Sequence, residues 1–332
     1  MKTGSKRVKR ATTIIAACLM ILSGLFFVTN ESKAAVTGKA GYLFVTLGQD
    51  NKVAKIDLKT GTVTDYINIK GISHGVAVSP NGKYIYTGQL KKLKANKILV
   101  TDILTKKRVA EIPVNMRTHH LAISKNGRYL YATATMAGKL LIINTDANKI
   151  TAQIKTGRLP YYVAVGPNDK YIYVTNKRAG TLSMLTLRGK NVATIKVGRG
   201  PSHIAFSPDG KKVYTTDAMS KTVSVVDIAE RKRVAKIEVG NDPHGIGVSS
   251  DGTIFVSNRR DNTVYMINPS SLKIVKKIII PEPGHIALGP SKNKMYVSSR
   301  ASDKIYVLNV LSGKILKKIA VDGEPHQIVF SR

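Results

Sequence analysis

The sequence contains no tryptophan and only one cysteine, Cys18. We expect the chain to be cleaved near Ala34, so the mature protein would contain no thiol. A protein without a thiol cannot form a disulfide, use a thiolate nucleophile or bind a metal through cysteine. Aromatic residues are also scarce, at 6% of the chain. This scarcity disfavours the rows of exposed aromatic side chains on which single-stranded nucleic acid usually stacks.

Acidic residues are few. The chain has 20 Asp and Glu against 53 Lys and Arg, which gives a formal net charge of +33. Residues 1–34 hold six of the basic residues and Glu31, so 47 basic and 19 acidic residues remain without them, a net charge of +28. This excess favours an anionic neighbourhood such as cell-wall polymer, nucleic acid or lipid headgroups. A generally basic, soluble surface explains it equally well, because the charge is spread along the chain.

Long apolar runs are missing except near the start. A basic segment, residues 2–10, precedes an apolar stretch, residues 11–28, and Ser32-Lys33-Ala34 offers a cleavage site with small residues. This order predicts a secretory signal peptide over residues 1–34 and a secreted or cell-surface protein. Two alternatives stay open. The apolar stretch could remain as a membrane anchor, or Cys18 in Ile15-Ala16-Ala17-Cys18 could be lipidated.

The sequence is rich in repetition. A sequence motif recurs seven times, about every 41 residues, and its clearest copy is Pro160-Tyr-Tyr-Val-Ala-Val-Gly-Pro-Asn-Asp-Lys-Tyr-Ile-Tyr-Val-Thr-Asn176. Each repeat holds four short apolar runs separated by turn residues such as Pro208-Asp-Gly210. A period near 40 of this kind predicts an all-β fold, a seven-bladed β-propeller with one four-stranded antiparallel blade per repeat.

The ends of the repeat array predict how the ring closes. We expect a single domain over residues 35–332 that opens with a second strand at 42–46 and ends with a lone inner strand at 327–330. If these two strands pair, the C-terminal strand completes the first blade and no radial edge is left unpaired. Within the array, only the loop 90–96 is longer than its counterparts. The predicted second strands start at Tyr42, Tyr84, Tyr129, Tyr171, Val213, Ile254 and Met295.

Tyr173-Val-Thr-Asn176 resembles the motif that names the YVTN-repeat propellers of bacteria and archaea. Ser207-Pro-Asp-Gly210 and the segment 222–227 match the flanking pattern, and the resemblance spans nearly all of residues 40–332. It implies an exported seven-bladed ring, often a binding or surface protein without known catalysis. Some enterobacterial members are associated with single-stranded DNA. WD40 propellers fit less well, because the Trp-Asp signature is absent.

All seven histidines fall at one place in the repeat, in the two residues before the predicted inner strand. The repeat without a histidine has Tyr161 and Tyr162 there. In a propeller this position lies at the mouth of the central channel, so we predict that these residues meet around the axis. The histidines are His74, His119, His120, His203, His244, His285 and His326.

Three interpretations of the histidines stay open: packing at a crowded strand entry, binding of a polar or anionic ligand, and a transition-metal site of the copper or zinc type. The histidines follow the start of the repeat by one or by two residues, and neighbouring residues of a strand face opposite ways. We therefore do not expect all seven in one inward-facing ring, and we assign no metal and no cofactor. The segment 73–82 is similar to the copper-binding propeller of nitrous oxide reductase, but the chain lacks that enzyme's cysteine-rich electron-entry domain.

Arginines are predicted around the same mouth, and the guanidinium group suits carboxylate and phosphate. Together with the histidines and the two tyrosines, they form our predicted ligand-binding set. The opposite face is also basic, so a generally cationic surface remains an alternative. The arginines of the set are Arg117, Arg158, Arg199, Arg259, Arg260 and Arg300.

Motifs for catalysis are missing. The sequence has no Gly-rich phosphate loop, no paired-histidine zinc-protease helix and no Gly-x-Ser-x-Gly elbow. We predict a monomeric, non-catalytic binding propeller for an anionic polymer or a small anionic ligand, with single-stranded nucleic acid or a cell-envelope protein as further candidate partners. The alternative is a metal-binding protein or an enzyme similar to propeller lactonases and lyases, which use His, Arg and Glu at the channel mouth. Glu282 and Glu324 stand beside His285 and His326 in this chain.

Overall fold

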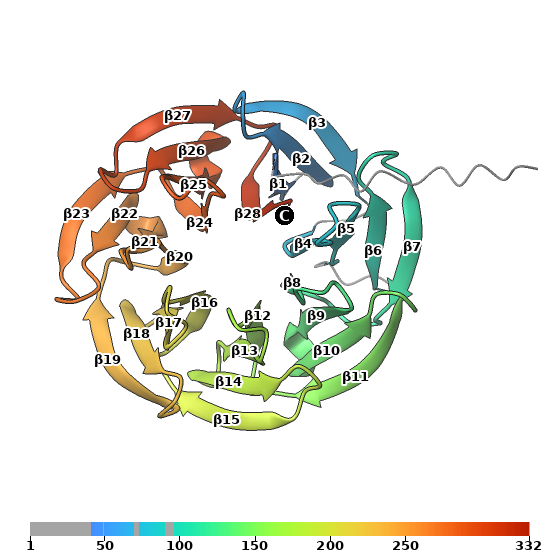
Figure 1. Cartoon of the computed structure of the whole chain (residues 1–332), viewed down its shortest axis with the longest axis horizontal. Coiled ribbons are helices and arrows are strands. Elements are labelled where there is room, and N and C mark those ends of the chain that lie inside the picture. The colour runs from blue at the N-terminus through green and yellow to red at the C-terminus, as the bar shows by residue number, and fades with distance from the viewer. Residues whose placement is uncertain (1–40, 49, 70–72, 90–95, 332) are drawn as a thin grey trace, which may run out of the picture. The chain divides into compact units, whose positions relative to one another are not determined.

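The computed structural model describes residues 41–48, 50–69, 73–89 and 96–331. They form seven four-stranded antiparallel sheets arranged as the blades of a ring (Figure 1). This confirms the predicted all-β, seven-bladed propeller. The predicted signal peptide with Cys18 and Ala34, and most of the long loop 90–96, lie outside the described residues. Among the residues described, no helix has the length and apolar character needed to cross a membrane.

We number the blades 1 to 7 in chain order and describe each from the axis outward. The inner strands are β28 (Pro325–Phe330), β4 (Val76–Val78), β8 (Leu121–Ile123), β12 (Pro160–Val165), β16 (Pro201–Phe206), β20 (Pro243–Val248) and β24 (Pro283–Leu288). The second strands are β1 (Tyr42–Leu47), β5 (Tyr84–Thr87), β9 (Tyr129–Ala134), β13 (Tyr171–Asn176), β17 (Lys212–Asp217), β21 (Ile254–Asn258) and β25 (Lys294–Ser299). Their starts agree with the predicted ones to within one residue.

The third strands are β2 (Lys52–Asp57), β6 (Lys97–Asp102), β10 (Lys139–Asn144), β14 (Thr181–Thr186), β18 (Thr222–Asp227), β22 (Thr263–Ile267) and β26 (Lys304–Asn309). The outer strands are β3 (Thr62–Asn68), β7 (Arg108–Pro113), β11 (Lys149–Lys155), β15 (Asn191–Lys196), β19 (Lys232–Glu238), β23 (Ile274–Ile279) and β27 (Ile315–Ala320). Single 3₁₀ turns, η1 (Thr135–Ala137), η2 (Arg259–Asp261) and η3 (Arg300–Ser302), follow three of the second strands.

The ring closes as predicted. Strand β28 pairs antiparallel with β1, with Phe330 opposite Leu43 and Ile328 opposite Val45. Figure 1 shows the last strand of the chain beside the first, so blade 1 is assembled from both ends of the described chain. Blade 1 therefore has four strands, like the other six blades that the structure describes.

The hydrophobic core lies between blades. In one representative cluster, Tyr214 and Val225 of blade 5 pack against Ile246 and Val256 of blade 6, and all four side chains are buried. Full burial of such a side chain stabilises the fold by roughly 1.5–3 kcal/mol. Because the cores bridge neighbouring blades, the blades pack side by side as predicted for a closed ring.

In five of the seven blades the inner strand does not pair regularly with the second strand. In blades 4 to 7 a proline opens the inner strand opposite the last residue of the second strand, for example Pro201 opposite Asp217, and the register then shifts before regular pairing resumes at Ile204. This irregularity is a bulge, in which extra residues of one strand oppose fewer of its partner. Blade 1 has a comparable shift between Val45 and Leu47.

A hydroxyl group occupies each bulge. The Oγ1 atom of Thr175 accepts a hydrogen bond from the Tyr162 amide at 3.0 Å and donates to the Ser202 carbonyl of the next blade at 2.8 Å. Thr216 likewise accepts from the His203 amide at 3.0 Å and donates to the His244 carbonyl at 2.7 Å. The threonine of the YVTN-like motif therefore links two neighbouring inner strands. Thr133 and Ser257 make the same pair of bonds.

One detail of the prediction was wrong. Four histidines lie inside their inner strands rather than before them, because these strands begin at the proline. They are His203, His244, His285 and His326. His74, His119 and His120 precede strands β4 and β8, as predicted.

We predict that Thr175→Val destabilises the protein by about 2–4 kcal/mol, because it leaves a buried amide and a buried carbonyl without partners. The matched control is Thr175→Ser, which keeps the hydroxyl, as Ser257 does in blade 6. Urea unfolding of both variants measures the difference. Equal stabilities for the valine and serine variants would contradict the proposed link.

Candidate functional site

The seven histidines and two tyrosines meet in one cluster around the axis. His74 contacts His119, His326 and His285, with ring centroids 4.1, 5.0 and 5.6 Å apart. His203 contacts His244 at 4.2 Å and His285 at 4.4 Å. Tyr161 packs on His119, and Tyr162 packs between His120 and His203. All nine rings are thus connected, and we call them the ring cluster.

The expectation that the one-residue offset would send the histidines to opposite faces was wrong. His203 and His244 stand two residues and one residue after their prolines, yet their rings are in contact. The alternation of side chains holds only in regularly paired strands. The bulge interrupts that pairing at the histidine positions. Residues at either offset can therefore point toward the axis.

The imidazoles of the ring cluster are neutral. Burial lowers the pKa of all seven histidines below the ordinary value of 6.5, since desolvation penalises the charged form. The pKa of His119 falls to about 3. Burial and then the Arg300 charge lower the pKa of His326 to about 4, although Glu324 opposes the change. Each ring therefore keeps a nitrogen lone pair at neutral pH.

Hydrogen bonds orient several of these rings. His119 Nδ1 lies 3.1 Å from the Tyr161 carbonyl oxygen, and His203 Nδ1 lies 3.0 Å from Ser202 Oγ. Other nitrogens lack a protein partner in the described part of the chain, namely His74 Nδ1 and His120 Nε2, both buried. On one side the channel continues as a cavity of about 310 Å³, lined by His120, Tyr162, Gln327 and apolar residues of the inner strands.

Charged residues form a layer at the channel mouth. The start of each inner strand adjoins the end of the second strand, so their loops lie at the same end of a blade. The Arg259 amide donates to the Asp242 carbonyl at 3.2 Å, and its guanidinium donates to Asp242 Oδ2 from Nε at 3.0 Å and from Nη2 at 2.7 Å. The η2 turn thus holds Arg259 against the loop that enters β20.

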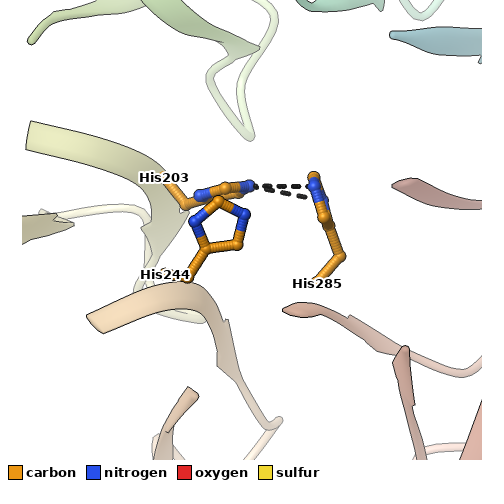
Figure 2. Close-up of side chains that lie close together, drawn as sticks. All are labelled: His203, His244 and His285. Carbon is orange, nitrogen blue, oxygen red and sulfur yellow. Dashed lines mark hydrogen bonds between the residues drawn. The ribbon is translucent and has the colours of Figure 1, made fainter. Parts of the chain in front are cut away.

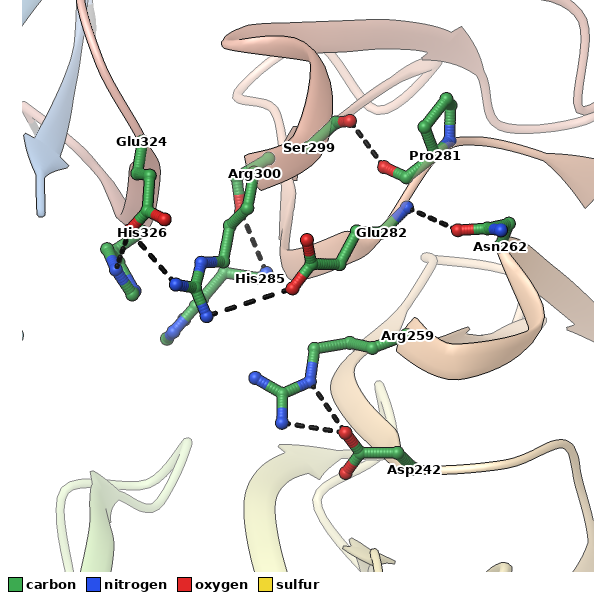
Figure 3. A network of polar contacts seen from close by, with 11 residues as sticks. Asp242, Arg259, Asn262, Pro281, Glu282, His285, Ser299, Arg300, Glu324 and His326 are labelled. Carbon is green, nitrogen blue, oxygen red and sulfur yellow. Dashed lines mark hydrogen bonds and ion pairs between the residues drawn. The ribbon is translucent and has the colours of Figure 1, made fainter.

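Arg300 occupies the matching place in the next blade, between two acids (Figure 3). Its Nη2 lies 2.9 Å from Glu324 Oε2, and its Nη1 lies 3.8 Å from Glu282 Oε1. Glu324 Oε2 is also 3.6 Å from His326 Nε2. The Nε atom of Arg300 is buried and makes no hydrogen bond with any described residue.

Lys177 is the exception at the mouth. Its ammonium group lies 4.1 Å from the centre of the Tyr161 ring. Burial first, and the nearby Arg259 charge second, lower the pKa of Lys177. Among the described residues it forms no ion pair with an acid, unlike Arg259 and Arg300. Two cations, Lys177 and Arg259, therefore lie near a single carboxylate, Asp242, which is ion-paired with Arg259.

The structure separates the predicted arginines into two groups. Arg259 and Arg300 belong to the mouth layer. The other four are exposed, and their side chains make no hydrogen bond or ion pair with the residues described. These four are Arg117, Arg158, Arg199 and Arg260.

The predicted ligand-binding set omitted Lys177 and Asp242. Asp242 directly precedes Pro243, as Glu282 precedes Pro283 and Glu324 precedes Pro325. An alignment of the repeats on the proline would have found it. Lys177 follows the YVTN-like motif of the one repeat with tyrosines in place of histidines, and its contact with Tyr161 depends on side-chain direction.

A family model described as the SMP-30/gluconolactonase/LRE-like region matches residues 174–301, which is less than half of the chain. A comparison with curated proteins gives no match. The match supports a propeller family, and the resemblance to the YVTN-repeat family stays a prediction.

Solved structures share the fold at low identity. Hydrazine synthase of Kuenenia stuttgartiensis is 17% identical over 82% of this chain and 93% of that one, with a TM-score of 0.75. A protein of Bacteroides uniformis assigned provisionally as a 6-phosphogluconolactonase is 18% identical over 88% and 100%, with a TM-score of 0.72. A dihydro-heme d1 dehydrogenase is 15% identical over 89% and 77%, with a TM-score of 0.67. These similarities show the fold alone.

We predict that the protein loses stability steeply below pH 6.5. The unfolded chain takes up protons on its histidines there, whereas the folded protein keeps them neutral to much lower pH, about 3 for His119 and about 4 for His326. The free energy of unfolding then falls with falling pH, by up to about 1.4 kcal/mol per pH unit for each imidazole. Urea unfolding between pH 8 and pH 5 measures this slope.

His119→Gln removes one such imidazole. We expect it to reduce the slope by up to about 1.4 kcal/mol per pH unit, the contribution of one proton, without abolishing it. A stability that stays constant between pH 7 and pH 5 would show that the imidazoles are protonated in the folded state.

Proposed function

We propose that the protein binds a small anion, a carboxylate or a phosphate, at the channel mouth above the ring cluster. The observation that supports this most directly is Lys177, a half-buried cation beside Arg259 without an ion pair to an acid among the described residues. A bound anion would supply the missing opposite charge. The proposal includes export of the protein, which the signal-like residues 1–34 favour.

The layer provides suitable donors. The Lys177 ammonium has three N–H groups, and the Arg300 Nε–H is buried without a partner among the described residues. Charge-assisted hydrogen bonds to an anion are roughly twice as strong as neutral ones. The ring cluster contacts this layer with neutral side chains, as where Lys177 lies over the Tyr161 ring. The site therefore suits binding without a bond-making step.

The test is isothermal titration with inorganic phosphate, gluconate and 6-phosphogluconate. We expect Lys177→Met to weaken binding about 10–100-fold, because it removes one charge-assisted contact of about 1.5–3 kcal/mol and keeps the length of the side chain. Binding should also weaken with rising salt.

Arg178→Met is the matched control, since it removes the same charge from an exposed neighbour of Lys177. It should leave the affinity unchanged. Equal affinities of the Lys177→Met variant and the unmodified protein, or no binding of any of the three anions, would disprove the proposed site.

A second candidate function is hydrolysis of a lactone. It is favoured by the family match over residues 174–301 and by the fold shared with the Bacteroides uniformis protein. In this reaction water adds to the lactone carbonyl, the ring C–O bond breaks and a hydroxy acid forms. His326 is neutral and is held 3.6 Å from Glu324, so its imidazole could accept a proton from the attacking water.

We predict that, if this function is present, hydrolysis of δ-gluconolactone exceeds the spontaneous rate and falls about 10²–10⁴-fold in His326→Gln. Acid release followed with a pH indicator measures it, with Arg178→Met as the control. A rate equal to that without protein would exclude this lactone as a substrate, and an unchanged rate in His326→Gln would remove the proposed role of His326.

A further inference from the structure

Three imidazoles from three successive blades converge within the ring cluster. They are His203 on β16, His244 on β20 and His285 on β24 (Figure 2). His203 Nε2 lies 3.3 Å from His285 Nδ1 and 3.4 Å from His285 Nε2. One nitrogen of each ring can be chosen so that all three lie within 4.8 Å of one another, and all three residues are buried.

These spacings match the ligand shell of a tetrahedral metal ion. Histidine nitrogens bind Zn²⁺ at about 2.0–2.1 Å, so two of them on a tetrahedron lie about 3.3–3.4 Å apart. The separation of His203 Nε2 and the His285 ring is already of this size. One His244 nitrogen lies within 4.8 Å of the His203 and His285 nitrogens, and it needs to approach them further to complete the ligand shell.

Protonation and orientation also suit a metal. A metal ligand must carry a free lone pair, and burial keeps these three imidazoles neutral. His203 Nδ1 is hydrogen-bonded to Ser202 Oγ at 3.0 Å. If Nδ1 carries the proton of this bond, the lone pair of His203 is on Nε2, the atom that faces His285. Such a partner on the second nitrogen is typical of metal-binding histidines.

Three other histidines of the ring cluster are engaged differently, and His74 lies outside the group that meets the distance requirement. His119 Nδ1 contacts the Tyr161 carbonyl, the Val163 amide donates to His120 Nδ1 at 3.4 Å, and His326 Nε2 lies beside Glu324. Among the described residues, His203, His244 and His285 are the group that meets the distance requirement for a shared ion. From the sequence, alternating side-chain directions argued against a shared metal ion, which stayed only an alternative, and the bulges remove that reason.

We propose that His203, His244 and His285 bind one divalent first-row transition-metal ion of the zinc type, with a fourth position open to water or to an anionic ligand. Three histidines with one open position form the arrangement typical of catalytic rather than structural zinc. The set contains only imidazole nitrogens, which suit Zn²⁺ and Cu²⁺ better than Ca²⁺ or Mg²⁺.

The competing explanation is a plain hydrogen bond between His203 and His285, with no ion. The test uses full-length protein without a histidine tag, freed of metal with a chelator and titrated with Zn²⁺ by calorimetry. We expect one site with micromolar or tighter affinity for Zn²⁺. This affinity should not change with pH above pH 7, where the imidazoles are already neutral. Substitution by Co²⁺ should give the intense visible absorption of a four-coordinate ion.

The variants His244→Gln and His285→Gln should each weaken Zn²⁺ binding at least about 100-fold. His119→Gln is the matched control, because it removes a buried imidazole from the same cluster but lies outside the proposed ligand set. It should bind Zn²⁺ as the unmodified protein does. No stoichiometric binding, or an equal loss in the control, would overturn the proposal.

A second measurement avoids the variants altogether, in case they do not fold. X-ray absorption at the zinc edge of the loaded, unmodified protein should show three imidazole ligands and one further light atom. Fewer than three imidazoles would mean that Zn²⁺ binds elsewhere, and would overturn the assignment. Because this readout requires no anion at the mouth, it stands independently of the proposed anion site.

Discussion

The hydroxyl group near the end of the second strand is the contact on which the centre of this ring depends. It accepts a hydrogen bond from an amide that the bulge has removed from the strand ladder, and it donates to a carbonyl of the next blade. Buried backbone groups without partners are costly, so the bulge could not persist without it. One short side chain thus satisfies backbone groups of two strands and links neighbouring blades.

The junction between blades 1 and 2 shows the same requirement met differently. Thr46 Oγ1 of blade 1 accepts a hydrogen bond from the Gln327 amide at 3.0 Å, and the inner strand β4 of blade 2 has only three residues. Here the Gln327 side chain accepts from the Val76 amide at 3.0 Å and donates to the Val76 carbonyl at 3.1 Å. The Gln327 side chain thus joins the inner strands of blades 1 and 2. Both solutions saturate backbone groups that would otherwise be isolated near the axis.

The bulge also explains the chemistry of the mouth. It turns histidines at two different offsets toward the axis, where burial keeps them neutral. The acids of the charged layer directly precede the prolines of the inner strands, and its arginines lie on the turns that follow the second strands. The result is a cluster of neutral imidazoles bordered by charged residues, of which Arg259 and Arg300 are paired with acids. The two sets are in contact, since Glu324 Oε2 lies 3.6 Å from His326 Nε2 and the Lys177 ammonium lies 4.1 Å from the centre of the Tyr161 ring.

The fold could be predicted from the period, because seven equal apolar repeats leave few ways to bury their faces. The gathering of histidines at the channel mouth followed from the same argument. Their convergence did not, since the rule of alternating faces fails at a bulge, and the bulge depends on a hydroxyl thirteen residues away along the chain. Nor could the sequence separate Arg259 from Arg260. A single 3₁₀ turn directs one toward Asp242 and leaves the other exposed.

The pairing of β28 with β1 has a consequence for biosynthesis. Strand β28 emerges from the ribosome after every other strand that the structure describes, yet it supplies the innermost position of the first blade, His326 and the Gln327 link to blade 2. The ring of described strands therefore cannot close before β28 has been synthesised. Completion of the ring and completion of the channel mouth are consequently one late event, and a chain interrupted before residue 325 would have neither.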